Sequence, residues 1–167
     1  MTNLDKHIAE WTWRDAAYAA LCELERMSEA VYDHSPEHWL SGRTNLFNKL
    51  GLHWDAEKFL AEAKVLGYYA IRALMIRGKW DKESLATLLA QKQHDYGTGN
   101  ILAFGEFGIA VRMSDKIARL KNLRGRTAKN ESMIDTLMDI IGYTVVAMML
   151  ENGTFFYKEL GLDSELG

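Results

Sequence analysis

The sequence predicts an all-α fold, a helical bundle of about five main helices. The chain has 167 residues, which suits one domain, so we expect residues 1–167 to form a single all-α domain. Apolar residues make up 48% of the chain, and Pro36 is the only proline, so long stretches are rich in good helix formers. The alternating pattern of β-strands is not sustained anywhere, which excludes a sheet-based fold.

Apolar residues at three- and four-residue spacing locate these helices. We expect them at about 13–32, 55–76, 81–94, 102–120 and 130–151. The segment 33–45, which contains the proline, is predicted to be a loop. Short helical turns are predicted at 45–50 and in the tail that follows Gly153.

Composition and charge also exclude several classes of protein. The net charge is -3 with acidic and basic residues intermixed, which argues against a dedicated nucleic-acid binder. Cys22 is the only cysteine, so no intramolecular disulfide forms. No apolar signal segment begins the sequence, and no stretch of about 18 residues is uninterruptedly apolar. We therefore expect a cytoplasmic protein that does not enter a membrane.

The most informative segment is the acidic helix predicted at 130–151. Glu131, Asp135 and Asp139 are four residues apart, so they fall within about 80° on one side of that helix. Ser132 with Asp135 fits a capping box, and the helix dipole favours Glu131 near the start. Asp139 lies two turns in and has neither explanation. The stripe is therefore either a metal or substrate site or a set of structural ion pairs on a solvated face.

The preceding helix, predicted at 102–120, offers a charged surface that suits this stripe. Arg112, Asp115 and Arg119 fall within about 60° of one another, and Lys116 lies beside them. A solvated face with ion pairs between successive turns has the same pattern. In the functional interpretation, Asp115 adds a metal ligand and the basic residues contact phosphate oxygens. Both interpretations stay open at this point.

Motifs in consistent order carry a resemblance to a known family. They are D-Y-G at 95–97, F-G at 107–108, R-x-x-D-K-x-x-R-L at 112–120 and N-E-S-x-x-D-T-L-x-D-x-x-G-Y at 130–143. The segment 91–149 resembles the phage and bacterial nucleotide modification associated domain of the first type. That family is similar to the all-α nucleoside triphosphate pyrophosphohydrolases of the MazG and dimeric dUTPase group. The first 80 or so residues carry no such resemblance.

Enzymes of that group bind Mg²⁺ through E-x-x-E on one helix and E-x-x-D on the next. Neither spacing occurs in this sequence, so the acidic stripe would replace the second motif, and Asp115, with or without Asp95, the first. The resemblance implies a hydrolase, dependent on Mg²⁺ or alternatively Mn²⁺, that splits (deoxy)nucleoside triphosphates into monophosphate and pyrophosphate. The implied metal ligands are Asp115, Glu131, Asp135 and Asp139. The implied catalytic residues are Asp115, Lys116 and Glu131, and the implied substrate-binding residues are Asp95, Tyr96, Asn100, Arg112, Lys116 and Arg119.

Two other functions remain compatible with these residues. One is a protein without turnover, which sequesters a nucleotide in the same pocket or assists a base-modifying enzyme. The other is a structural helical module in which the charges form ion pairs. Tyr96, Asn100 or an aromatic residue of the N-terminal half would contact the base. The resemblance also implies a homo-oligomer.

Overall fold

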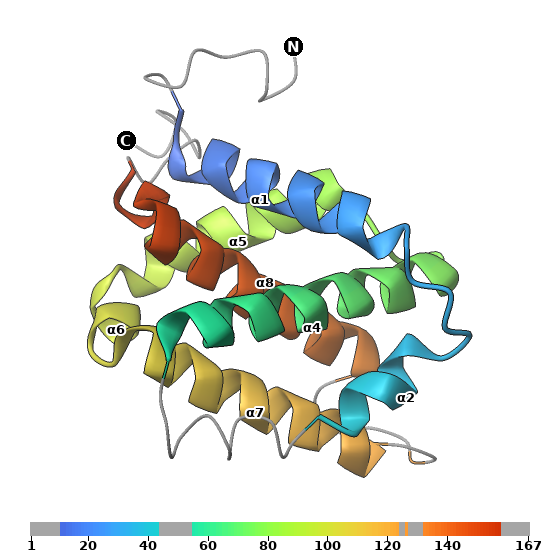
Figure 1. The fold of residues 1–167 in the computed structure, drawn as a ribbon. Coiled ribbons are helices and arrows are strands. Elements are labelled where there is room, and N and C mark those ends of the chain that lie inside the picture. Colours follow the sequence, from blue (N-terminus) through green and yellow to red (C-terminus); the bar gives the residue numbers. More distant parts are fainter. Residues whose placement is uncertain (1–10, 44–54, 124–125, 127–131, 158–167) are drawn as a thin grey trace.

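Seven α-helices and one 3₁₀ helix form the regular structure of the described part of the chain (Figure 1). This computed structural model describes residues 11–43, 55–123, 126 and 132–157. No strand occurs among them, so the predicted all-α fold is confirmed. The elements are, in chain order, α1 (Trp13–Ser28), α2 (Pro36–Ser41), α4 (Ala56–Ile76), α5 (Lys82–Tyr96), α6 (Gly99–Leu102), α7 (Gly105–Leu123), α8 (Met133–Asn152) and η3 (Thr154–Phe156).

The five predicted helices are present as α1, α4, α5, α7 and α8, with shifts of a few residues at their ends. The prediction of a loop at 33–45 was wrong, because this segment contains α2. Pro36 occupies the start of α2, where a missing backbone N–H leaves no helical hydrogen bond unmade. The predicted helical turn at 45–50 lies outside the described residues.

The chain turns at two glycines near the start of the helix that was predicted at about 102–120. Gly97 ends α5 with a φ of 67°, and Gly105 has a φ of 57° between α6 and the first full turn of α7. Positive φ values are easily adopted only by glycine, so the chain can turn sharply at both positions. The predicted single helix is therefore the short α6 followed by α7. The predicted short helix after Gly153 is found as η3.

Side-chain caps fix the starts of two helices that carry site residues. Thr12 N–H donates to Asp15 Oδ2 at 2.9 Å, and Asp15 N–H donates to Thr12 Oγ1 at 3.3 Å. This complete capping box holds Trp13 at the first position of α1. Asp81 caps α5, because its Oδ1 accepts the Ser84 N–H at 3.1 Å.

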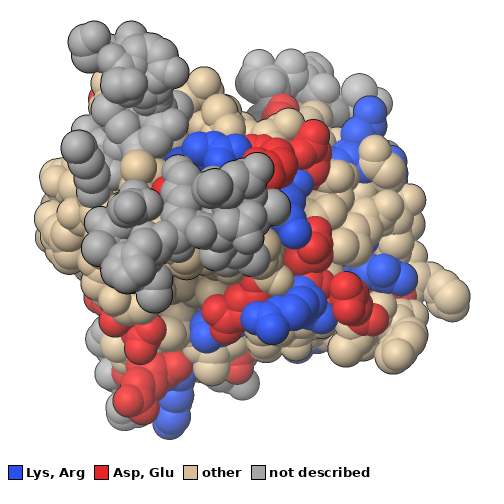
Figure 2. Space-filling view, turned by 90° about the horizontal axis from the view of Figure 1, so that it is seen from above, with Lys and Arg blue, Asp and Glu red and all other residues tan. Residues whose placement is uncertain are grey.

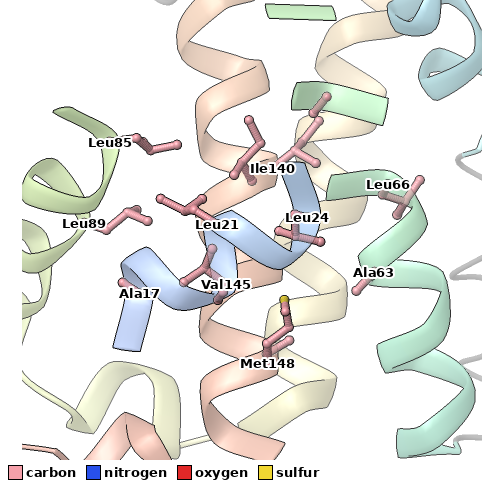
Figure 3. Packing of buried hydrophobic residues seen from close by; sticks show 14 of the residues in the cluster. Ala17, Leu21, Leu24, Ala63, Leu66, Leu85, Leu89, Ile140, Val145 and Met148 are labelled. Atoms are coloured by element: carbon pink, nitrogen blue, oxygen red, sulfur yellow. The ribbon is translucent and has the colours of Figure 1, made fainter. Parts of the chain in front are cut away.

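Helix α8 runs through the middle of the bundle and packs against α1, α4 and α7 (Figure 1). Its buried side chains meet those of the surrounding helices in one continuous cluster. In Figure 3, Leu21 of α1 lies among Leu85 and Leu89 of α5 and Val145 of α8. Leu21 and Val145 are fully buried, so the centre of the fold is closed by side chains of at least three helices.

Helices α4 and α8 approach each other closely at Gly67 and Thr144. A Cβ atom on Gly67 would lie 2.8 Å from Cγ2 of Thr144, a distance that real side chains do not adopt. The Thr144 hydroxyl lies 3.0 Å from both the Ala63 carbonyl of α4 and the Ile140 carbonyl of its own helix. Glycine at 67 therefore allows the two helices to touch, and Thr144 links their backbones.

Helix α8 is also long and apolar enough to cross a membrane, judged by length and composition alone. Half of its 20 residues are buried inside the bundle, however, and it carries Asp135 and Asp139. A core helix that is covered by other helices needs an apolar surface all round. The apolarity of α8 is thus accounted for by its central place in the fold.

Charges of both signs lie side by side on the face seen in Figure 2. Ion pairs between helices fit this pattern: Arg14 of α1 contacts Glu83 of α5 at 2.8 Å, and Lys64 of α4 contacts Glu23 of α1 at 3.3 Å. Such partly exposed pairs contribute little to stability individually. Among the described residues, acidic and basic side chains alternate on this face, as the intermixed sequence predicts.

Candidate functional site

Asp139, the residue of the acidic stripe without a local explanation, is held by two lysines from other helices. Its Oδ1 lies 3.3 Å from Lys92 Nζ of α5, and its Oδ2 lies 2.9 Å from Lys116 Nζ of α7. The Asp139 and Lys116 side chains are 22% and 21% exposed, whereas Lys92 is 46% exposed. The pair with Lys116 is therefore the shorter and the better shielded from solvent.

These three residues lie on the wall of a cavity that five helices enclose. Its volume is about 410 Å³, within the range of small-molecule sites. Helices α1, α5, α6, α7 and α8 all contribute to its lining. The lining residues are Trp13, Leu89, Lys92, Gln93, Tyr96, Asn100, Ile101, Arg112, Lys116, Asp139, Gly142, Tyr143 and Val146.

The cavity is locally basic although the chain as a whole is acidic. Lys92, Arg112 and Lys116 line it, and among the described lining residues Asp139 is the only carboxylate against them. Arg112 Nη2 donates to the Asn100 carbonyl at 3.4 Å, which ties α7 to α6 at the cavity wall. Three cations from two helices around one space are a suitable environment for a phosphate group.

Two buried residues of the cavity lining carry hydrogen-bond donors without a partner in the described chain. Trp13 is 1% exposed and Gln93 is 6% exposed. Neither Trp13 Nε1 nor Gln93 Nε2 has a hydrogen-bond partner within the described chain. Trp13 packs edge to face on Phe155, with ring centroids 6.5 Å apart and planes at 68°, so its indole ring is held by the core.

Comparison with known proteins adds no identification. No family model, curated protein or solved structure matches the chain. The resemblance to the nucleotide modification associated domain therefore stays a prediction. The interpretation of the cavity rests on the residues that line it.

Several residues of the resembling motifs come together in this cavity. Tyr96, Asn100, Arg112, Lys116 and Asp139 were predicted site residues, and all five line it. They come from α5, α6, α7 and α8, and only the fold brings them to one place. This is the part of the predicted site that the structure assembles.

Four other predicted residues in the described part of the chain, Asp95, Asp115, Arg119 and Asp135, do not line the cavity. Asp95 is 76% exposed and lies 3.3 Å from His94 Nδ1. Asp115 is exposed on α7, and Arg119 is half-buried one turn further along the same helix. Glu131 lies outside the described residues, so its predicted roles as metal ligand and catalytic residue are not addressed by the described site.

One half of the capping box predicted for Ser132 and Asp135 is found at the start of α8. Ser132 Oγ accepts the Asp135 N–H at 3.1 Å and so caps the helix, and the Ser132 hydroxyl donates to Asp135 Oδ2 at 2.9 Å. Asp135 also lines a second cavity of about 210 Å³, which shares Lys92 and Asp139 with the larger one. Two predicted metal ligands thus face one small space, but a lysine lies beside them.

The described carboxylates do not fit a Mg²⁺ site in this arrangement. Both oxygens of Asp139 already contact ammonium groups, Asp135 Oδ2 accepts the Ser132 hydroxyl, and Asp115 is exposed and does not line the cavity. No group of three potential metal ligands occurs in the described parts of the chain. A hard cation prefers several oxygen ligands, and two lysines would oppose its entry. The predicted Mg²⁺ dependence stays a prediction.

Lys92, Gln93 and Trp13 were not singled out by the sequence. Lys92 and Gln93 lie just before the D-Y-G motif and carried no signal of their own. For Trp13, the sequence predicted only that some aromatic residue of the N-terminal half contacts a base. Gly142 and Tyr143 belong to the G-Y motif and line the cavity beside Asp139. A Cβ on Gly142 would lie 2.8 Å from Leu89 Cδ2, so this glycine lets α5 and α8 approach at the cavity wall.

Proposed function

We propose that this protein binds a nucleotide in the large cavity, with the phosphates at Lys92, Lys116 and Arg112. The observation that carries the proposal is the pair of lysines that reach Asp139 from two helices at the wall of a space of about 410 Å³. In the free protein, Asp139 balances these ammonium groups. A bound phosphate supplies more negative oxygens than one carboxylate, so it competes for the same lysines.

The remaining lining suits the other parts of a nucleotide. Tyr96 and Tyr143 offer aromatic faces, and base stacking on such faces is tolerant of base identity. Leu89, Ile101 and Val146 supply apolar surface for the flat ring of a base. The net charge of -3 disfavours long nucleic acids, whereas a basic cavity admits a small anion. We place this function in the cytoplasm.

The proposal is tested by calorimetry in the presence of a metal chelator. Tripolyphosphate and ATP are titrated into the wild-type chain and into Lys116→Met. We expect Lys116→Met to weaken both ligands by about tenfold or more, since it removes a charge-assisted contact. Lys121→Met is the matched control, because Lys121 is exposed on the same helix and does not line the cavity. Absence of binding of either anion by the wild-type chain would refute the proposal.

Hydrolysis of the bound nucleotide is a second proposal, carried over from the resemblance. Asp135 and Asp139 line one small cavity next to the large one, but a metal ion there would have to replace their contacts with Ser132 and the two lysines. Incubation of all ribo- and deoxynucleoside triphosphates with Mg²⁺ or Mn²⁺, followed by phosphorus NMR, distinguishes the two. Released pyrophosphate indicates an enzyme, and intact nucleotide that binds tightly indicates a sequestering protein. The expected homo-oligomer also stays a prediction, which light scattering tests directly.

A further inference from the structure

Two buried donors in the cavity lining indicate which base is bound, an inference that rests on the proposed nucleotide-binding function. Trp13 Nε1 and Gln93 Nε2 are both buried and lack partners within the described chain, although their residues line the cavity. Buried donors are paired in the great majority of cases, because an unpaired one loses its hydrogen bonds to water. A ligand that offers acceptors would restore these bonds.

The Trp13 indole determines which kind of ligand group can pair with it. An indole nitrogen only donates, whereas the amide of Gln93 can be turned to present either oxygen or nitrogen. The contact with Phe155 fixes the Trp13 ring, and the capping box of Thr12 and Asp15 fixes the backbone at this point. The group that meets Trp13 must therefore be an acceptor.

The fold separates this donor from the phosphate-binding residues. Asp139, with its two lysines, lies in the second turn of α8, and Val146 is the cavity residue nearest the other end of that helix. Seven residues of helix span about 10 Å. Trp13 packs on Phe155, which follows the C-terminal end of α8. A ligand with phosphate at the lysines thus extends toward Trp13 with the part furthest from its phosphates, which is the base.

We propose that Trp13 Nε1, supported by the Gln93 amide, selects nucleobases that carry a ring oxo group over those that carry an amino group at the same position. An oxo oxygen, as in hypoxanthine, guanine or uracil, accepts the indole N–H. An amino group, as in adenine or cytosine, directs its own N–H toward the indole donor and leaves both unpaired. A site with such a donor rejects the wrong ligand because its buried polar group then loses its partner.

Matched ligands test this selection with the full chain in a chelator. Inosine triphosphate and ATP differ mainly in the oxo or amino group, as do UTP and CTP, and tripolyphosphate lacks a base. We expect the oxo nucleotide of each pair to bind about tenfold to a hundredfold more tightly, the cost of one unpaired donor. Equal affinities within both pairs would overturn the inference while leaving nucleotide binding intact. Failure of tripolyphosphate and all nucleotides to bind would instead refute the proposed function.

Variants of Trp13 and Gln93 show which residue causes the selection between oxo and amino bases. Trp13→Phe keeps an aromatic ring without the donor, so it should lower the affinity for inosine triphosphate to that for ATP and leave tripolyphosphate binding unchanged. Trp39→Phe is the control, since Trp39 stacks on Tyr69 and does not line the cavity. Gln93→Met, which keeps the length of the side chain, gives the second test if Trp13→Phe does not fold. Selection that persists in Trp13→Phe would refute the role of the indole, and selection that is undiminished in Gln93→Met would refute the role of the amide.

Discussion

Replacing Asp139 by asparagine removes the carboxylate that Lys92 and Lys116 share while keeping its size. In the proposed binding site, this carboxylate repels an incoming phosphate and competes with it for the same ammonium groups. We therefore expect Asp139→Asn to bind tripolyphosphate and ATP more tightly than the wild-type chain when no metal is present. A metal ligand or a general base would behave in the opposite way.

The magnitude follows from the distances and exposures. Two unit charges about 6 Å apart interact by about 3 kcal/mol at an effective dielectric constant of about 20. Lys92 is 46% exposed and the Asp139 side chain is 22% exposed, so solvent reduces this value to about 1–1.5 kcal/mol. The expected gain in anion affinity is therefore about tenfold. The same change leaves two neighbouring lysines without their carboxylate, so stability should fall by about 1 kcal/mol.

Calorimetry with a chelator measures the affinity, and urea unfolding measures the stability. Asp115→Asn is the control, because it makes the same change in net charge at an exposed position of α7 outside the cavity lining. We expect its anion affinity to change less than twofold, since an exposed charge outside the cavity lining is screened by water and salt. Weaker anion binding by Asp139→Asn in the absence of metal would refute the reasoning, because Asp139 would then help to bind the anion.

Two further changes test the fold. In Gly67→Ala the new Cβ would lie 2.8 Å from Thr144 Cγ2, so we expect a loss of about 1–3 kcal/mol in urea unfolding; wild-type stability would show that α4 and α8 separate easily. Burial alone would raise the pKa of Glu25, but hydrogen bonds from Trp80 and Lys82 outweigh it and lower this pKa below its ordinary value. Glu25 therefore stabilises the fold above its unfolded pKa of about 4.3, and the contribution is lost as pH falls through the lower folded pKa. Glu25→Gln should flatten the decline of Tm below about pH 5, and an unchanged decline would contradict this assignment.

Local patterns in the sequence were sufficient for the main helices and insufficient for the short ones. Periodic apolar residues and polar caps are properties of one segment, so α1, α4, α5, α7 and α8 were predicted within a few residues of their observed ends. Helix α2 has only six residues and begins with Pro36, and its composition is that of a loop. Its helical form depends on packing against α4 and α7, which no local pattern reports.

In the candidate site too, some residues were predicted from local sequence and others are revealed only by the fold. Asp139 was singled out because no cap or dipole explained a carboxylate in the second turn of an apolar helix, and Lys116 because it belongs to a recognisable motif. Lys92 is 47 residues from Asp139 and belongs to another helix, so only the fold reveals their contact. Trp13 is separated from Asp139 by an even longer stretch of sequence than Lys92 is. Helical projection predicts which residues share a face, but it does not predict which helices become neighbours.

The link between α4 and α8 has a consequence for how the cavity responds to a ligand. Thr144 falls about 140° around α8 from Asp139, so the hydroxyl that contacts the Ala63 carbonyl lies on the side away from the cavity. Because that side is anchored to α4, we expect α8 to stay in place on binding and α5 and α7 to adjust, since their lysines must leave Asp139. Amide hydrogen exchange should therefore slow on α5 and α7 when a nucleotide binds, while α8 stays equally protected with and without it.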